Sequence, residues 1–215
     1  MNIMNTYKIL TIIHIIFALT AFVSGLVSIF VNPKGGSLHR KSGRFYFYFY
    51  VGVIFTALVM LTIKFKIFFL ALTLFNAYLI ISGIYYSKKN EKIIGKNWWL
   101  LSFLILVILV FMTDVSLVIS NIEYYEYGWI IVSFSYAILA VSVFIFQLTV
   151  KRNRFLLHAA TMLLSYITLI NGILAQLSPI GNVWIFWIAG YIIFIPLMIL
   201  WFKKSKKLQL LLKTQ

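Results

Sequence analysis

Uninterrupted apolar segments of about 20 residues recur along the whole chain, and this feature restricts the fold most strongly. A helix rises 1.5 Å per residue, so about 20 apolar residues cross the roughly 30 Å hydrocarbon core of a bilayer. Hydrophobic residues make up 63% of the chain and charged residues 11%, which is far from the composition of soluble domains. Because lipid offers no hydrogen bonds to backbone groups, we expect each spanning segment to be a helix.

We therefore predict an all-α, polytopic transmembrane bundle of seven helices. It forms one domain over residues 1–215, with short loops and a basic cytoplasmic C-terminal tail. The junction at Lys64 and Lys66 leaves two alternatives, a break between two spans or a kink in one long helix. The expected spans are Tyr7–Val31, Phe45–Ile63, Phe65–Tyr86, Trp98–Ser120, Gly128–Val150, Phe155–Leu177 and Asn182–Phe202.

The basic residues predict the orientation of these helices. With seven spans, all but three of the 19 lysines and arginines fall on one side, and Lys8, Lys64 and Lys66 fall on the other. By the positive-inside rule, the N-terminus is then outside and the C-terminus cytoplasmic. The net charge of +15 lines the cytoplasmic face, where it meets membrane lipids and not nucleic acid. Small-residue helix faces leave a homo-oligomer open as a further partner.

The segment KGGSLHRKSGRFYFYFY, residues 34–50, joins the first two expected spans. Asn32-Pro33 ends the first helix, and Gly35-Gly36 lets the chain turn. His39 then falls in a loop, and the aromatic residues 45–50 form a belt at the membrane interface where the second helix begins. Their alternation resembles a strand, but an open strand edge is not stable in lipid, so a helix is expected.

A spaced set of residues in the first, second and sixth spans resembles a known family. The set comprises His14, Ala18, Ala21, Gly25, Lys34-Gly35-Gly36, His39-Arg40, Gly43-Arg44, Tyr46, His158, Met162, Ser165 and Tyr166. It is similar to the bacterial family of membrane proteins labelled domain of unknown function 2306. The resemblance implies a multi-pass protein of the bacterial inner membrane, and it implies no activity because the family has none assigned. That family favours an arginine where this chain has Leu164.

Two ionisable groups lie deep in the expected spans and are candidates for binding a proton or a polar ligand. His14 lies roughly 10 Å below the outer end of the first span, and Asp114 lies at nearly the same depth in the fourth. We therefore expect this imidazole and this carboxylate to meet in the outer half of the bundle. Asn76 and Gln176, on polar faces of the third and sixth spans, are further ligand-binding candidates. Such faces are also typical of helix-packing seams.

His39 and His158 form a second candidate site near the cytoplasmic boundary. With Arg40 and Arg44 they are suited to a cofactor, a metal ion or a phosphate-bearing ligand. The alternative is that both histidines only tie a loop to a helix end. The chain has no cysteine, which excludes disulfides, thiolate metal sites and Fe–S clusters.

Three functions remain open at this point. The first is a non-enzymatic carrier or accessory, ligand-binding protein that uses His14 and Asp114. The second is a membrane redox protein linked to b-type haem or quinone, with His39 and His158 as ligands. The third is an enzyme acting on lipid, but the chain shows no nucleophile elbow, HExxH motif or Walker loop. A retinal protein is excluded because the last expected span has no lysine for the Schiff base.

Overall fold

The computed structural model confirms an all-α helical bundle. It describes residues 3–31, 34–87, 98–121, 127–150, 153–177 and 185–192, together with 196 and 199. Six long helices are α1 (Ile3–Phe30), α2 (Ser37–Ile63), α3 (Ile67–Ser87), α4 (Trp98–Ser120), α5 (Tyr127–Thr149) and α6 (Arg154–Leu177). Residues 185–192 are also helical and lie within the seventh expected span, whose remainder is largely outside the described residues.

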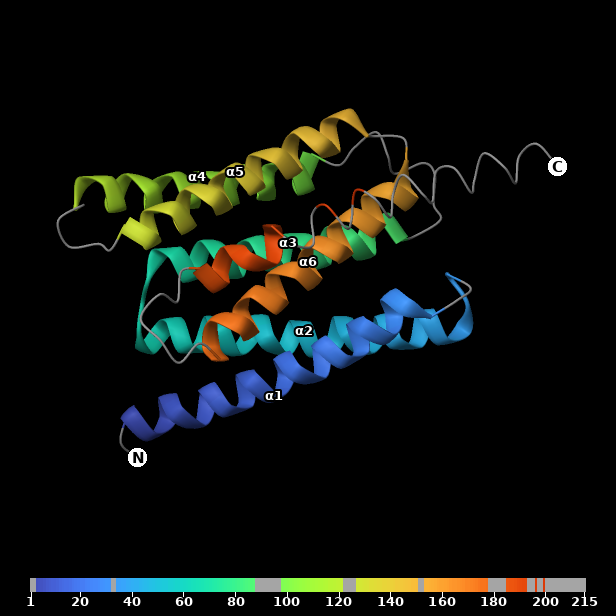
Figure 1. Ribbon diagram of the computed structural model, residues 1–215, viewed down its shortest axis with the longest axis horizontal. Helices are drawn as coiled ribbons and strands as arrows, with labels where there is room; N and C mark the ends of the chain where they lie inside the picture. Colours follow the sequence, from blue (N-terminus) through green and yellow to red (C-terminus); the bar gives the residue numbers. More distant parts are fainter. Residues whose placement is uncertain are drawn as a thin grey trace.

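All six long helices have the length and apolar composition to cross a membrane, as in a multi-pass integral membrane protein. Figure 1 shows them in three tiers, with α4 and α5 along one edge, α3 and α6 in the middle, and α1 and α2 along the other edge. The helix α3 packs against α2, α4, α5 and α6. More than half of the membrane-length window is buried in α3 and in α6, but much less in α1. The interior of the protein is therefore built around α3 and α6.

Four of the helices form a group with a simple order. α1 packs against α2 and α6, and α3 also packs against α2 and α6. α2 and α6 therefore lie diagonally across this group, and the long side chains of Tyr46 and Tyr50 connect them. This diagonal arrangement sets which polar residues meet in the centre.

Side-chain contacts show which helix ends lie together. His39 near the start of α2 bonds to Ser28 near the end of α1, and His158 near the start of α6 bonds to Gly83 near the end of α3. At the opposite end, the Lys64 ammonium lies 4.8 Å from the centre of the Tyr7 ring. The first of these ends is called the basic end, because it holds Lys34, Arg40, Lys41, Arg44 and Arg154. For the described basic residues, the partition predicted from the sequence is confirmed.

The helix α2 begins eight positions earlier than the expected Phe45. Gly35 turns the chain with φ 79°, and Gly36 precedes the helix in extended conformation, with φ −65° and ψ 173°. His39 consequently lies in the first turn of α2, so its placement in a loop is wrong. Basic side chains can reach water from a helix that extends beyond its apolar part, which explains the early start.

The turn before α2 is held by Lys34. Its ammonium donates to the carbonyl of Val31 at 3.0 Å and approaches that of Ser28 at 3.4 Å. Ser28 lies in the last turn of α1 and Val31 directly follows the helix, so both carbonyls have few partners within the helix itself. Burial lowers the pKa of Lys34.

At the other end of α2, the chain breaks between Ile63 and Ile67, so the alternative of one kinked helix is wrong.

Candidate functional site

One face of α6 carries polar side chains into the centre of the bundle. The residues Thr161, Ser165, Thr168 and Asn171 are all buried. They are spaced by three or four positions, so they lie on one face of the helix. The polar face expected on this helix is therefore an interior face. Asn171 was not among the expected members, and the side chain of Gln176 lies outside the described residues.

Two tyrosines of α2 meet this face. The Tyr46 hydroxyl lies 2.8 Å from Ser165 Oγ. The Tyr50 hydroxyl lies 2.8 Å from Asn76 Oδ1 of α3 and 3.1 Å from Thr168 Oγ1. We call Tyr46, Tyr50, Asn76, Ser165 and Thr168 the bonded cluster, because each polar side chain in it has a hydrogen-bond partner. Helices α2, α3 and α6 are joined by these contacts in the middle of the bundle.

The bonded cluster holds fewer protons than acceptor sites. The single phenolic proton of Tyr50 faces Asn76 Oδ1, Thr168 Oγ1 and, at 3.0 Å, the carbonyl of Ser165. The Thr168 hydroxyl likewise reaches that carbonyl at 2.7 Å and also contacts Asn76 Oδ1. A hydroxyl group donates one hydrogen bond and can accept others. Rotation of the hydroxyl hydrogens of Tyr50 and Thr168 therefore switches between alternative hydrogen-bond partners without moving the packed side chains.

A second polar group lies beside the first and is bonded less well. The Tyr136 hydroxyl of α5, Asn171 Oδ1 and the Tyr191 hydroxyl are buried, and no hydrogen bond of good geometry to a described residue reaches them. They approach one another closely enough for weak hydrogen-bond contacts within the group, and the two rings pack edge to face with centroids 5.2 Å apart. Tyr50 is also within electrostatic range of Tyr136. We call Tyr136, Asn171 and Tyr191 the open cluster.

The open cluster is held in place by its surroundings. Asn171 Nδ2 donates to the carbonyl of Trp187 at 2.9 Å, which connects α6 to the helical residues 185–192. The ring of Tyr136 also packs against Phe68 and Phe111. The orientation of these side chains is therefore fixed by packing, whereas three of their polar atoms keep hydrogen-bonding capacity that their weak mutual contacts do not use in full.

His14 and Asp114 do not form the expected pair. His14 Nδ1 lies 2.7 Å from Thr56 Oγ1 of α2. Asp114 is 3% exposed on α4, interacts with Ser133 of α5, and its Oδ2 has no partner among the described residues. Figure 1 shows α1 and α4 at opposite edges of the bundle. Equal depth along two helices does not make them neighbours, and the order of the helices separates these residues.

His39 and His158 are brought to the same end of the bundle. His39 Nδ1 lies 3.0 Å from the Ser28 carbonyl oxygen, and His158 Nδ1 lies 2.7 Å from that of Gly83. The two imidazoles are within electrostatic range of each other. Arg40 and Arg44 are exposed on the same part of α2.

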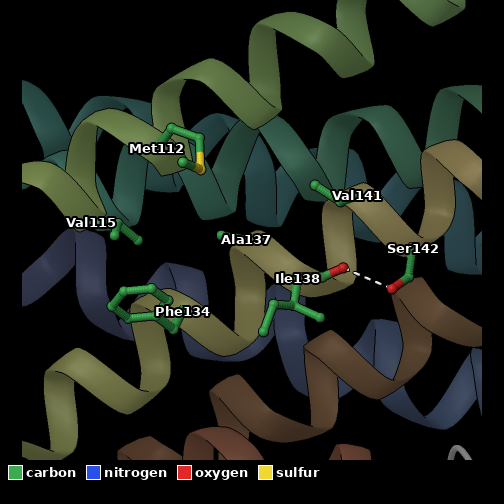
Figure 2. Close-up of a pocket in the computed structure, with 7 residues that line it drawn as sticks. All are labelled: Met112, Val115, Phe134, Ala137, Ile138, Val141 and Ser142. Carbon is green, nitrogen blue, oxygen red and sulfur yellow. Dashed lines mark hydrogen bonds between the residues drawn. The ribbon is translucent and has the colours of Figure 1, made fainter.

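A groove of about 310 Å³ lies between α4 and α5, away from the polar clusters. Figure 2 shows its lining residues, and the dashed line joins Ser142 to the carbonyl of Ile138, a hydrogen bond of 2.8 Å. Met112 and Ile138 are more than half exposed. Apart from Ser142 the lining is apolar, so this groove offers no polar recognition.

The tyrosines of the bonded cluster carry a sequence signal. Tyr46 and Tyr50 are four positions apart, which places both on one helical face, whereas Phe45 and Tyr48 are exposed. The expected interfacial belt at residues 45–50 is therefore wrong for these two side chains. Tyr136 and Tyr191 had no comparable signal, since isolated tyrosines in apolar runs are common.

Comparison of the chain with protein-family models, curated proteins and solved structures gives no match.

Proposed function

We propose that this protein is a non-enzymatic membrane carrier in which the polar face of α6 and the bonded cluster conduct a proton. The observation that carries the proposal is the Tyr50 hydroxyl, which is buried in the middle of the bundle and faces three acceptors. A group of this kind can receive a proton from one neighbour and pass its own to another. Hydroxyl and amide groups without a nucleophile–base pair support conduction better than catalysis.

The proposed path follows α6. It begins at His158 at the basic end, continues through Thr161 and Ser165 to the bonded cluster, and reaches the open cluster at Asn171. His158 and Asn171 are separated by roughly 20 Å at 1.5 Å per residue, which is about two thirds of a 30 Å hydrocarbon core. The excess of basic residues supports a cytoplasmic position for the basic end. His14 and Asp114 are not part of this path.

The test is proton flux into vesicles that contain the purified protein and an internal pH-sensitive dye, driven by a potassium diffusion potential. We expect Tyr50→Phe to slow the flux by roughly tenfold, because losing one relay hydrogen bond adds about 1.4 kcal/mol to the barrier. Tyr48→Phe makes the same change on the same helix, at a side chain that is 66% exposed, and is expected to leave the flux unchanged.

Two results would contradict the proposal. One is a wild-type flux equal to that of protein-free vesicles. The other is a flux through Tyr50→Phe that equals wild type while both proteins unfold at the same temperature. Swelling of the same vesicles in a neutral solute such as urea distinguishes proton conduction from a pathway for small polar molecules.

A further inference from the structure

One face of α2, which lies at an edge of the bundle in Figure 1, is exposed along much of the helix. Its exposed side chains are spaced by three, four and seven positions, so they form one stripe along the helix. Tyr46 and Tyr50, which bond to α6, lie on the opposite face. We call the part of this stripe nearest the basic end the outer stripe. It comprises Arg40, Lys41, Arg44, Phe45, Tyr48 and Phe55.

The outer stripe has a cationic part and an aromatic part. The three cations lie near the start of α2, and the three aromatic side chains follow, each more than half exposed. Arg44 and Phe55 are eleven positions apart, or roughly 16 Å along the helix, which is about half of a 30 Å hydrocarbon core. With the cations at the membrane surface, the aromatic part therefore extends over the depth of one leaflet.

The cations of the outer stripe have no anionic neighbour in the described part of the chain. Their side chains form no hydrogen bond or ion pair with a described residue, and the carboxylate found there, Asp114, is buried on α4. The first turn of α2 contains no acidic residue. Arg40 and Arg44 are four positions apart, where like charges on a helix repel each other. An anion held among these side chains would offset the repulsion and accept charge-assisted hydrogen bonds from the guanidinium groups.

We propose that the outer stripe binds one anionic phospholipid from the leaflet at the basic end. Its phosphate lies among the three cations, and one acyl chain lies along the three aromatic side chains. Guanidinium groups bind phosphate oxygens through paired hydrogen bonds, and the ammonium of Lys41 adds a further positive charge. A soluble phosphate compound would leave the aromatic part uncovered, whereas a lipid covers both parts. The headgroup carries net negative charge, because these cations repel the ammonium of a zwitterionic headgroup.

A fluorophore on the stripe tests this inference, because the chain has no cysteine and one can be introduced for labelling. Val51→Cys places the label on exposed α2 beside the aromatic part. The labelled protein is reconstituted in phosphatidylcholine vesicles, and lipids with a nitroxide on the acyl chain are added as quenchers. We expect phosphatidylglycerol to quench at a mole fraction at least tenfold lower than phosphatidylcholine, since each cation near the membrane surface contributes about a factor of five.

Two substitutions with the same change of charge separate the site from the overall charge of the protein. Arg44→Gln is expected to raise the mole fraction of phosphatidylglycerol needed for half-quenching about fivefold. Lys66→Gln removes one exposed cation at the opposite end of α2 and is expected to leave it unchanged. Both side chains are exposed, so both variants are expected to unfold at the wild-type temperature.

A second label position measures the general attraction of anionic lipid to the basic end. Leu106→Cys places the label on exposed α4, whose first turn meets the end of α3 through Trp99 and Tyr85. This label lies at the opposite edge of the bundle from α2 in Figure 1. We expect a smaller preference for phosphatidylglycerol there, and Arg44→Gln is expected to leave that preference unchanged.

Four results would overturn the inference. The first is equal quenching of the Val51→Cys label by the two lipids. The second is an equal effect of Arg44→Gln and Lys66→Gln at this label. The third is a loss of preference at the Leu106→Cys label as large as that on α2. The fourth is relief of quenching by millimolar inorganic phosphate but not by sodium chloride of equal ionic strength, which would identify a soluble anion as the ligand. None of these measurements depends on proton flux.

Discussion

Two pairs of buried tyrosines lie near one another in this bundle but differ in their hydrogen bonding. Tyr46 and Tyr50 of α2 have well-formed hydrogen bonds to α3 and α6, whereas the hydroxyls of Tyr136 and Tyr191 have only weak contacts with each other and with Asn171. A buried hydroxyl with a partner contributes modestly to stability, and one without a partner costs free energy. The first pair therefore fixes how α2 meets α6, and the second retains capacity for a ligand or a proton.

Packing around the bonded cluster is expected to give the largest effect. A Cβ atom at Gly25 of α1 would lie 2.6 Å from the Tyr166 ring and 2.9 Å from the Tyr46 ring. Rigid aromatic rings cannot move aside easily, so Gly25→Ala is expected to destabilise the protein by about 2 to 3 kcal/mol. Thermal unfolding in detergent measures the change.

Gly172→Ala on α6 is the control for that substitution. No atom lies within 4 Å of the position where its Cβ would be. The same change should therefore be neutral or stabilising by about 0.5 kcal/mol, since alanine favours the helix. Equal destabilisation by both substitutions would show that close packing around Tyr46 and Tyr166 is not what makes Gly25 necessary.

Asp114 is expected to show the next largest effect, with the opposite sign. Its carboxylate is buried on α4, and Oδ2 has no partner among the described residues. Ser133 interacts with this carboxylate, but one carboxylate oxygen stays unsatisfied in a membrane segment, so replacing it by an apolar side chain should relieve its cost, and Asp114→Leu is expected to stabilise the protein by about 1 to 2 kcal/mol. A lower unfolding temperature would show that the contact with Ser133 outweighs the cost of burying the carboxylate. Ser133→Ala, which removes its neighbour on α5, is the companion variant.

Removing single hydroxyls compares the two tyrosine pairs directly. Tyr50→Phe is expected to cost about 0.6 to 1.7 kcal/mol, the range for hydrogen bonds between membrane helices. Tyr136→Phe removes a hydroxyl with only weak contacts to Tyr191 and Asn171, which roughly offset the cost of burying it, so its unfolding free energy is expected to stay within about 0.5 kcal/mol of wild type. Equilibrium unfolding of both variants in the same detergent checks this. A larger loss for Tyr136→Phe would mean that its hydroxyl is bonded in the folded protein.

Much of the architecture could be predicted from local sequence. The apolar runs predict the helices, and the alternating placement of Lys34, Lys64 and their neighbours predicts which ends lie together. Both signals depend only on the length of a segment and on charge. The start of α2 was wrong by eight positions because apolar content marks the hydrocarbon core, and basic side chains allow a helix to continue beyond it.

The candidate site was predictable only in part. Helical periodicity indicated the polar face of α6 and the small-residue face of α1, because both repeat within one helix. The absence of a His14–Asp114 contact, and the meeting of Tyr50 with Asn76, depend on which helices are neighbours. That order is decided by packing between segments far apart in the chain, such as Gly83 of α3 against Met162 of α6, and no single segment carries it.

The smallest expected effect concerns the coupling between hydroxyls. In a double-mutant cycle, Tyr50→Phe and Thr168→Val should be coupled by about 0.5 to 1 kcal/mol, because the two hydroxyls are 3.1 Å apart and share Asn76 Oδ1. Tyr136→Phe and Tyr191→Phe should show coupling below about 0.3 kcal/mol, since the rings remain packed and the contact between their hydroxyls falls short of good hydrogen-bond geometry. Strong coupling in the open cluster would mean that a shared molecule connects these tyrosines, and a proton path through it would then include that molecule.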